Sequence, residues 1–302
     1  MLEITKKIEL TGHKAAIYAM IPLRDGYVFS GGVDKHVILW DINNQDKSKL
    51  LIRSNETIYS LFYYEVLNQL MIGTSGGKIH VVDLNLQKEI KLIHLHNSAI
   101  FDLKYYNGYL LSASSDGFLG FTNLDTLVIE RLVKFSDEKL RSVDIKGNLA
   151  LLACGDSNIK LIDLDKKLLI NSIIAHEKSC NVAKFHPNSD LVLSGGWDAH
   201  LNIWTLNLEP VKSIPAHNYA IYAIEFSKTQ NLMATASRDK TIKIWDSNNI
   251  GAPKTIAYEN FTGHQFSVNK IYWESDGKTL VSSGDDRKLM VWLINNSSNY
   301  NF

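Results

Sequence analysis

The sequence repeats itself at intervals of about forty residues, and this period limits the possible folds more than any other feature. Four segments match one another closely: SGGVDKHVILW (30–40), SGGWDAHLNIW (194–204), TASRDKTIKIW (235–245) and SSGDDRKLMVW (282–292). Weaker copies are IGTSGGKIHVV (72–82), SASSDGFLGFT (112–122) and LACGDSNIKLI (152–162). A fixed period of this length is typical of a fold assembled from like units that bury their apolar faces against one another.

The spacing and composition of the copies predict the structure of each unit. The turn Asp, or the residue that replaces it, falls at 34, 76, 116, 156, 198, 239 and 286, so successive copies are 42, 40, 40, 42, 41 and 47 residues apart. Runs such as HVILW, TIKIW and NIKLI are short, β-branched and bounded by turn residues, which favours strands. No run of helical length and period separates them, which argues against parallel βαβ topology. The sequence predicts an all-β fold: a seven-bladed β-propeller of four-stranded antiparallel blades.

The chain resembles the WD-repeat family over nearly its whole length. Gly-His pairs at 12–13 and 263–264 and Trp-Asp pairs at 40–41 and 245–246 carry the resemblance. In that family a His, a Ser or Thr, an Asp and a Trp form a hydrogen-bonded network inside a blade, which we call the framework. The resemblance implies the following frameworks in blades one, five, six and seven: His13, Ser30, Asp34 and Trp40; His176, Ser194, Asp198 and Trp204; His217, Thr235, Asp239 and Trp245; and His264, Ser282, Asp286 and Trp292.

Three blades depart from this framework. The third has Thr122 in place of the Trp, the fourth keeps only Asp156, and the second has Gly76 at the Asp position. We therefore expect blades two to four to depend on apolar packing. A set of His, Ser and Asp also invites a hydrolase interpretation, but its recurrence in four blades favours a structural role.

The two ends of the chain predict how the last blade is completed. After Trp292 only LINNSSNYNF remains, which is too short and polar to supply a good outer strand. At the N-terminus, Leu2, Ile4, Ile8 and Leu10 alternate with mostly polar residues. We expect residues 1–10 to pair onto the last blade as its outer strand, which would close the propeller and protect its edge. The predicted domain is a single propeller over residues 1–294, followed by a polar, disordered tail at 295–302.

Composition narrows the function and the location. Lys and Arg together number 32, as do Asp and Glu, and the resulting zero net charge argues against a general attraction to nucleic acid or anionic lipid. The N-terminus lacks the apolar core of a secretory signal, and no stretch approaches the length of a membrane span. Cys154 and Cys180 form no CxxC motif, which suits a reducing compartment or simple burial. The sequence predicts a cytoplasmic protein.

No motif indicates catalysis, a metal or a cofactor, and we predict none of the three. Residues 73–77, GTSGG, match the G-x-S-x-G nucleophile pattern, but that motif needs a helix after its Ser and the strand-like KIHVVDL follows here. His94 and His96 could supply half of a metal site. His96 already belongs to the framework, however, and no Cys or His partner lies at a useful spacing.

Two sets of positions vary from blade to blade while the framework repeats. The resemblance implies that the turn before each Asp and the start of the innermost strand open on one face of the propeller. The turn positions are Val33, Ser75, Ser115, Gly155, Trp197, Arg238 and Asp285, and the inner-strand positions are Tyr18, Tyr59, Phe101, Arg141, Asn181, Tyr222 and Asn269. Trp197 and Arg238 lie at turn tips, where we expect them to be exposed. The inner-strand aromatic residues either face a partner or pack between blades.

These positions are rich in Tyr, Trp and Arg, the residue types that most often dominate interface energetics. We predict a non-catalytic interaction scaffold or adaptor, a monomeric propeller within a complex, that presents an aromatic and cationic face to a protein or peptide. The candidate partner-binding residues are Trp197, Arg238, Tyr18, Tyr59, Phe101, Arg141 and Tyr222. One alternative is that the same face binds nucleic acid or a phosphorylated ligand. The other is an enzyme with a site at the central channel, for which the charged candidates are Arg141, Asp102 and Asp144.

Overall fold

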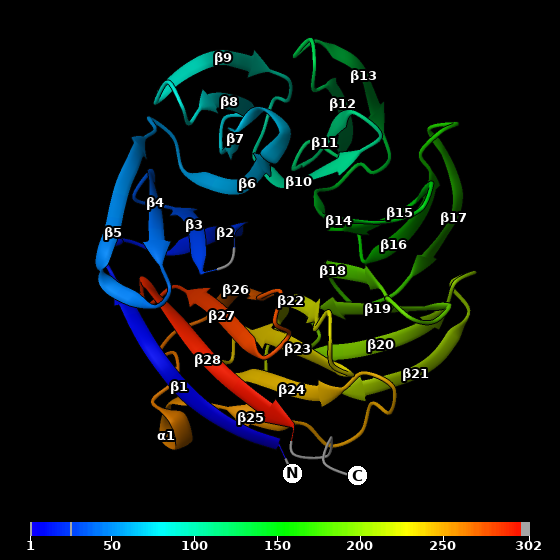
Figure 1. The fold of residues 1–302 in the computed structure, drawn as a ribbon. Helices are drawn as coiled ribbons and strands as arrows, with labels where there is room; N and C mark the ends of the chain where they lie inside the picture. The colour runs from blue at the N-terminus through cyan, green and yellow to red at the C-terminus, as the bar shows by residue number, and fades with distance from the viewer. Residues whose placement is uncertain (1, 25, 297–302) are drawn as a thin grey trace. The chain divides into compact units, whose positions relative to one another are not determined.

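A computed structural model describes residues 2–24 and 26–296 of the chain (Figure 1). The described strands form seven four-stranded antiparallel sheets, as the sequence predicts, and we number these blades one to seven along the chain. The chain divides into two compact units: unit 1 comprises Met1–Arg53 and Tyr222–Phe302, and unit 2 comprises Ser54–Ile221.

Unit 2 contains blades two to five. Blade two consists of β6 (Ile58–Tyr64), β7 (Gln69–Thr74), β8 (Lys78–Asp83) and β9 (Lys88–His94), with a short 3-10 helix, η1 (Glu65–Leu67), after β6. Blade three consists of β10 (Ile100–Tyr106), β11 (Tyr109–Ser114), β12 (Phe118–Asn123) and β13 (Ile129–Lys134). Blade four consists of β14 (Leu140–Lys146), β15 (Leu149–Cys154), β16 (Asn158–Asp163) and β17 (Leu168–Ile174). Blade five consists of β18 (Cys180–Phe185), β19 (Leu191–Gly196), β20 (His200–Thr205) and β21 (Pro210–Pro215).

Unit 1 contains blades one, six and seven. Blade one consists of β2 (Ile17–Arg24), β3 (Tyr27–Gly32), β4 (His36–Asp41) and β5 (Asn44–Arg53). Blade six consists of β22 (Ile221–Phe226), β23 (Leu232–Ser237), β24 (Ile242–Asp246) and β25 (Lys254–Ile256), and a short helix, α1 (Tyr258–Phe261), follows it. Blade seven consists of β26 (Val268–Trp273), β27 (Thr279–Gly284), β28 (Lys288–Asn296) and the N-terminal strand β1 (Leu2–Thr11).

The N-terminal strand completes blade seven, which confirms the prediction made from its alternating pattern. β1 pairs antiparallel with β28, from Leu2 opposite Asn296 to Thr11 opposite Lys288, and Figure 1 shows the two strands side by side. Ile4 and Leu10 are buried, as their positions in the alternation require. β28 runs to Asn296, two residues past the predicted end of the propeller at residue 294. Residues 297–302, the rest of the predicted tail, lie outside the described residues.

Neighbouring blades within each unit share apolar cores. In unit 2, Leu111 and Phe121 of blade three cluster with Val143 and Leu152 of blade four. In unit 1, Val28 and Ile38 of blade one cluster with Tyr272 and Val291 of blade seven. Burial of this apolar surface stabilises the fold by roughly 25 cal/mol per Å², but it is not directional. The polar contacts described next are directional and fix how each blade is assembled.

Candidate protein-interaction surfaces

The four framework side chains of blade one form a continuous chain of hydrogen bonds. His13 Nδ1 lies 3.0 and 2.9 Å from the two carboxylate oxygens of Asp34, His13 Nε2 lies 2.7 Å from Ser30 Oγ, and Trp40 Nε1 donates to the same Oγ at 2.7 Å. Because an indole N–H can only donate, the hydroxyl proton of Ser30 is left for His13 Nε2. The imidazole N–H at Nδ1 then donates to the carboxylate, so every member has a partner.

The same chain recurs in other blades. In blade five, His176 Nδ1 lies 2.8 Å from Asp198 Oδ1, His176 Nε2 lies 2.9 Å from Ser194 Oγ, and Trp204 Nε1 donates to Ser194 Oγ at 3.0 Å. The matching distances in blade seven, for His264, Asp286, Ser282 and Trp292, are 2.8, 2.8 and 2.9 Å. In blade six, Trp245 Nε1 donates to Thr235 Oγ1 at 2.9 Å. Blade three keeps the first two links, His96 to Asp116 at 3.2 Å and His96 to Ser112 at 2.8 Å.

Burial makes these frameworks structural. Ser30, Ser194 and Ser282 have no exposed surface, so a substrate cannot reach their hydroxyl oxygens. Burial lowers the pKa of His13 and of His96, which favours the neutral ring. Burial also raises the pKa of Asp198, but hydrogen bonds from His176 and from backbone amides outweigh it and lower that pKa to about 2. The carboxylate of Asp198 is therefore ionised at neutral pH.

Blade two contains a polar cluster that the sequence analysis missed. Glu56 lies 20 residues before Gly76, the spacing at which blade three has His96 before Asp116. Its carboxylate accepts hydrogen bonds from Thr74 Oγ1 at 2.5 Å, from the Gly76 amide at 3.1 Å and from Lys78 Nζ at 2.5 Å. The hydrogen bonds from Lys78 and Thr74 lower the pKa of Glu56 to about 2. The turn of blade two is therefore tied down by an ion pair.

Blade four uses a third solution. Ser136 occupies the His position and donates to Asp156 Oδ2 at 2.8 Å. Lys160 Nζ contacts the same oxygen at 3.2 Å and donates to the Phe135 carbonyl at 2.7 Å. The expectation that blades two to four depend on apolar packing is wrong, because blades two and four carry substitute polar contacts and blade three keeps three of the four framework residues.

The inner-strand candidate positions coincide with β-bulges. In six blades the pairing between the inner strand and the next strand skips one residue, and those residues are Tyr18, Tyr59, Phe101, Arg141, Asn181 and Asn269. A bulged residue is left out of the ladder and its side chain is re-aimed relative to the strand. The bulge gives a physical reason why these residues vary while the strand around them keeps its apolar pattern.

Three of these bulged residues in unit 2 form a row in which the middle one contacts the other two, and we call them the aromatic–arginine row. The rings of Tyr59 and Phe101 meet edge to face with their centroids 5.2 Å apart. The guanidinium carbon of Arg141 lies 5.0 Å from the centroid of Phe101. All three side chains are partly buried. Tyr59 and Phe101 therefore pack between blades, each ring against a residue of the next blade, and each keeps part of its surface exposed.

The remaining candidates are distributed over both units. Trp197, in unit 2, is 40% exposed in the turn after β19, and its amide donates to the Ser179 carbonyl at 2.9 Å. Arg238, in unit 1, is exposed in the turn after β23. Tyr18 and Tyr222, also in unit 1, are partly buried. Both turn-tip residues thus have the exposure expected of them.

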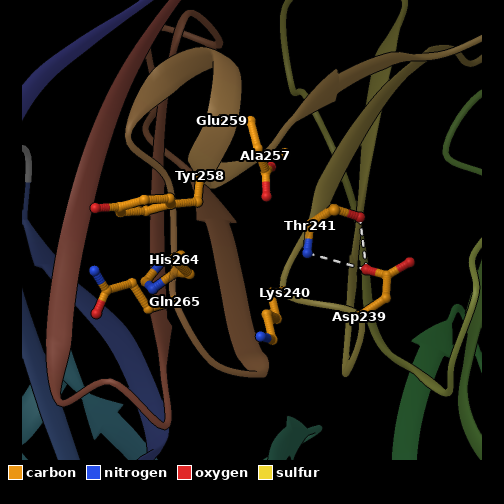
Figure 2. Close-up of a pocket in the computed structure, with 8 residues that line it drawn as sticks. All are labelled: Asp239, Lys240, Thr241, Ala257, Tyr258, Glu259, His264 and Gln265. Atoms are coloured by element: carbon orange, nitrogen blue, oxygen red, sulfur yellow. Dashed lines mark hydrogen bonds between the residues drawn. The ribbon is translucent and has the colours of Figure 1, made fainter.

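A small pocket lies beside the Arg238 turn in unit 1 (Figure 2). It has a volume of about 270 Å³ and is lined by Asp239, Lys240, Thr241, Ala257, Tyr258, Glu259, His264 and Gln265. Thr241 donates to Asp239 Oδ1 from its amide at 3.0 Å and from its hydroxyl at 2.6 Å. The side of the pocket formed by helix α1 lies within the longest interval between repeats, the 47 residues from Asp239 to Asp286. A pocket of this size lies below the usual range for small-molecule sites and can accommodate one side chain.

Two of the three charged candidates for a central-channel enzyme, Asp102 and Asp144, join neighbouring inner strands, and the third, Arg141, lies over the Phe101 ring. Asp102 Oδ2 accepts from the Val143 amide of the next blade at 3.0 Å, and Asp144 Oδ2 accepts from the Phe185 amide at 2.9 Å. The G-x-S-x-G match at residues 73–77 is followed by strand β8, not by a helix. Within residues 2–24 and 26–296, no group of three or more His, Cys, Asp or Glu side chains could hold a metal ion, and no helix has the length and apolarity needed to span a membrane.

Comparison with known proteins identifies the family. The family model described as WD domain, G-beta repeat matches residues 4–41, 167–205, 208–246 and 256–292, half of the chain. The chain belongs to the WD40 family. Each matched segment ends at or one residue after the framework Trp of blade one, five, six or seven, the blades with a complete framework in the sequence. The unmatched residues 42–166 include all of blades two and three and the first three strands of blade four.

Relatives and a solved structure agree with this family. Coronin-2A from Bos taurus is 27% identical over 173 residues, which cover 50% of this chain and 32% of that protein. Nuclear distribution protein PAC1 from Arthroderma otae is 22% identical over 276 residues, which cover 78% of this chain and 59% of that protein. This WD40 chain therefore spans between about a third and three-fifths of their lengths. The WD40 β-propeller domain of Doa1 matches over 100% of both chains with a TM-score of 0.86 at 16% identity, and the fold is a seven-bladed β-propeller.

Proposed function

We propose that this WD40 propeller is a non-catalytic interaction scaffold that binds a protein or peptide segment through its bulged inner-strand residues and turn tips. The observation that carries the proposal is the aromatic–arginine row of Tyr59, Phe101 and Arg141, three bulged residues of successive blades in which Phe101 contacts both of its neighbours. Partly exposed rings and a guanidinium offer a partner apolar contact together with hydrogen-bond donors.

The rigidity of the blades supports this role. The bulged residues extend from strands whose other residues are paired in the sheet, so little backbone entropy remains to be lost when a partner binds. Trp197 is a further candidate contact in unit 2. In unit 1, Arg238 with the adjacent pocket is the corresponding candidate, and Tyr18 and Tyr222 are the inner-strand candidates there.

The chemistry of the buried groups favours a scaffold over an enzyme. The framework serines are enclosed, and Asp102 and Asp144 accept backbone hydrogen bonds. The names of relatives refer to pre-mRNA processing, ribosome biogenesis and nuclear distribution. Such variety fits a fold whose partner is selected by variable surface residues. Cys154 and Cys180 are free and buried, and burial raises the pKa of Cys154 to about 12, which suits the proposed cytoplasmic location.

Affinity capture with matched variants tests the proposal. We expect Phe101→Ala/Arg141→Ala to lose at least one protein that the wild-type chain retains, because truncation removes the centre of the row. The control is Val211→Ala/Lys212→Ala on outer strand β21, which should retain the same protein. Thermal melts of both variants establish that they fold. If every captured protein survives the loss of Phe101 and Arg141, the row is not the binding surface.

A further inference from the structure

The outer strand of blade four, β17, exposes an unusual amount of aliphatic surface. Leu168, Leu169, Ile170 and Ile174 are 61%, 50%, 51% and 78% exposed. β17 is the last strand in the sheet order β14-β15-β16-β17, so one of its edges has no neighbour within the sheet. The sequence LLINSII thus places a row of apolar side chains along an open sheet edge.

The other outer strands differ from β17 in one respect. Each carries at least one charged residue: β1 reads LEITKKIELT, β5 NQDKSKLLIR, β9 KEIKLIH, β13 IERLVK, β21 PVKSIP and β25 KTI. Charged residues and prolines on an edge oppose pairing with a further strand, because the charge would lose its hydration and proline cannot donate. β17 has neither, so its edge lacks these two protections against strand addition. A bulge at Ile170 interrupts its pairing with β16, as equivalent bulges do in β9, β13 and β21, so the bulge does not distinguish β17 from these outer strands.

We propose that β17 pairs with β17 of a second copy of this chain, forming a weak homodimer. An uncharged aliphatic edge is matched by an uncharged aliphatic strand, because a charged residue placed against Ile or Leu would be desolvated without compensation. A second β17 meets this requirement, and a twofold axis lets each copy cover the other. The zero net charge of the chain adds no long-range repulsion between copies.

One local contact must be exchanged when the dimer forms. The amide of Ser172 donates to Asn171 Oδ1 at 2.8 Å, and Asn171 Nδ2 donates to the Asn207 carbonyl at 2.8 Å. Both bonds are exposed, so a carbonyl of the partner strand can replace the first at little net cost.

The size of the contact sets its strength. A strand of seven residues buries less than a standard protein interface, so we expect a dissociation constant on the order of 10 µM. At nanomolar concentration the chain is then monomeric, as predicted from the sequence.

Blade five supplies a matched control. β16 pairs Lys160 with Ser172, and β20 pairs Asn202 with Ser213, so Ser172 and Ser213 hold equivalent positions on two outer strands. Ile170 and Val211, two residues earlier in each strand, are 51% and 54% exposed. Ile170 is therefore matched by Val211, and Ser172 by Ser213. When the same substitution is made at both members of a pair, the two variants differ only in the strand that carries the change.

Analytical ultracentrifugation of the full chain from about 1 to 100 µM tests the dimer. We expect the wild type and Val211→Lys to shift from monomer to dimer over this range, and Ile170→Lys to stay monomeric because its charge lies on the edge. A wild type that stays monomeric at 100 µM overturns the proposal, and so does equal association of the two variants. A monomeric wild type is also the result expected if β17 is instead covered by a strand of another protein.

Crosslinking locates the contact independently. We expect a short bismaleimide to link Ser172→Cys into a covalent dimer at 50 µM and to leave Ser213→Cys monomeric. The native Cys154 and Cys180 are buried, and burial raises the pKa of both thiols, so they contribute little background. Equal crosslinking of the two variants, or none in Ser172→Cys, would exclude β17 as the interface.

Discussion

Blades five and two use different side chains to connect the corresponding turn to the strand that precedes it. In blade five, His176 joins Asp198 of the turn to Ser194 of β19, and Ser194 in turn binds Trp204. In blade two, Glu56 reaches the turn without an intermediary by accepting the amide of Gly76, the hydroxyl of Thr74 and the ammonium of Lys78.

The two arrangements also differ in their contact with water. Ser194 is fully buried and His176 almost so, whereas the side chains of Glu56 and Lys78 remain 22% and 32% exposed. Loss of a buried partner leaves donors or acceptors that water cannot reach, whereas water can replace much of an exposed ion pair. In both blades a polar side chain fixes the turn to its blade. Whether that contact is buried or exposed decides how much stability is lost when it is removed.

The largest effect is expected from Ser194→Ala. This substitution leaves Trp204 Nε1 and His176 Nε2 without their partner inside blade five, and we expect it to lower the free energy of unfolding by about 2–4 kcal/mol. Urea unfolding measures the total loss, and amide exchange of β18 to β20 locates it.

The control for Ser194→Ala is Ser213→Ala, which removes an exposed hydroxyl from the same blade and should change stability by less than about 0.5 kcal/mol. A loss below about 1 kcal/mol for Ser194→Ala would mean that water enters the blade and takes over the bonds of the hydroxyl.

A smaller, pH-dependent effect is expected from Glu56→Gln. The pKa of Glu56 is lowered from its ordinary value of 4.5 to about 2, so its contribution to stability is complete above pH 4.5 and is lost as the pH falls towards 2. Near pH 7 we expect a loss of less than about 1 kcal/mol, because solvent screens this pair. Thermal melts from pH 7 to pH 2 should show the gap between wild type and variant closing with acidification.

Glu65→Gln, on the exposed η1 helix, serves as the control for this series. It removes the same charge close to blade two but breaks no side-chain bond recorded for the described residues. A gap between wild type and Glu56→Gln that stays constant from pH 7 to pH 2 would assign the effect to side-chain shape and not to the charge.

The comparison of blades also separates what the sequence could predict from what it could not. The repeat period and the framework positions predicted seven antiparallel blades, and the alternation of Leu2, Ile4, Ile8 and Leu10 predicted the pairing of β1 with β28. The polar contacts of the turns in blades two and four could not be predicted from the framework pattern, because they use other residue types at another spacing. Lys78 follows its turn position by two residues, whereas Lys160 follows Asp156 by four.

Exposure was the other quantity that the sequence left open. The positions of Tyr59 and Phe101 followed from the alignment of the repeats, but their edge-to-face contact depends on how two blades meet. The sequence of β17, LLINSII, is an apolar run, and a run of this length usually forms a buried strand. Because β17 is the last strand of its sheet, four of its apolar side chains are exposed instead. Local sequence fixes the strand, and the order of strands decides which side chains meet water.

The only stabilising effect among these substitutions is expected in blade three. Thr122 stands where other blades have the Trp, its side chain is fully buried, and its Oγ1 has no hydrogen-bond partner among the described residues. Thr122→Val keeps the shape and removes the unsatisfied hydroxyl, so we expect a gain of about 1 kcal/mol in the free energy of unfolding, measured by urea unfolding.

The same substitution at Thr235 in blade six is the control, because Thr235 Oγ1 accepts the Trp245 N–H at 2.9 Å and its loss should destabilise. Opposite signs for the two Thr→Val variants would separate a hydroxyl that is bonded from one that is merely enclosed. If Thr122→Val instead destabilises as much as Thr235→Val, a buried water must satisfy the Thr122 hydroxyl. In blade three a water molecule would then take the place of the Trp N–H as hydrogen-bond partner. Blade three and the complete frameworks would both have a hydrogen-bonded hydroxyl and would differ only in what binds it.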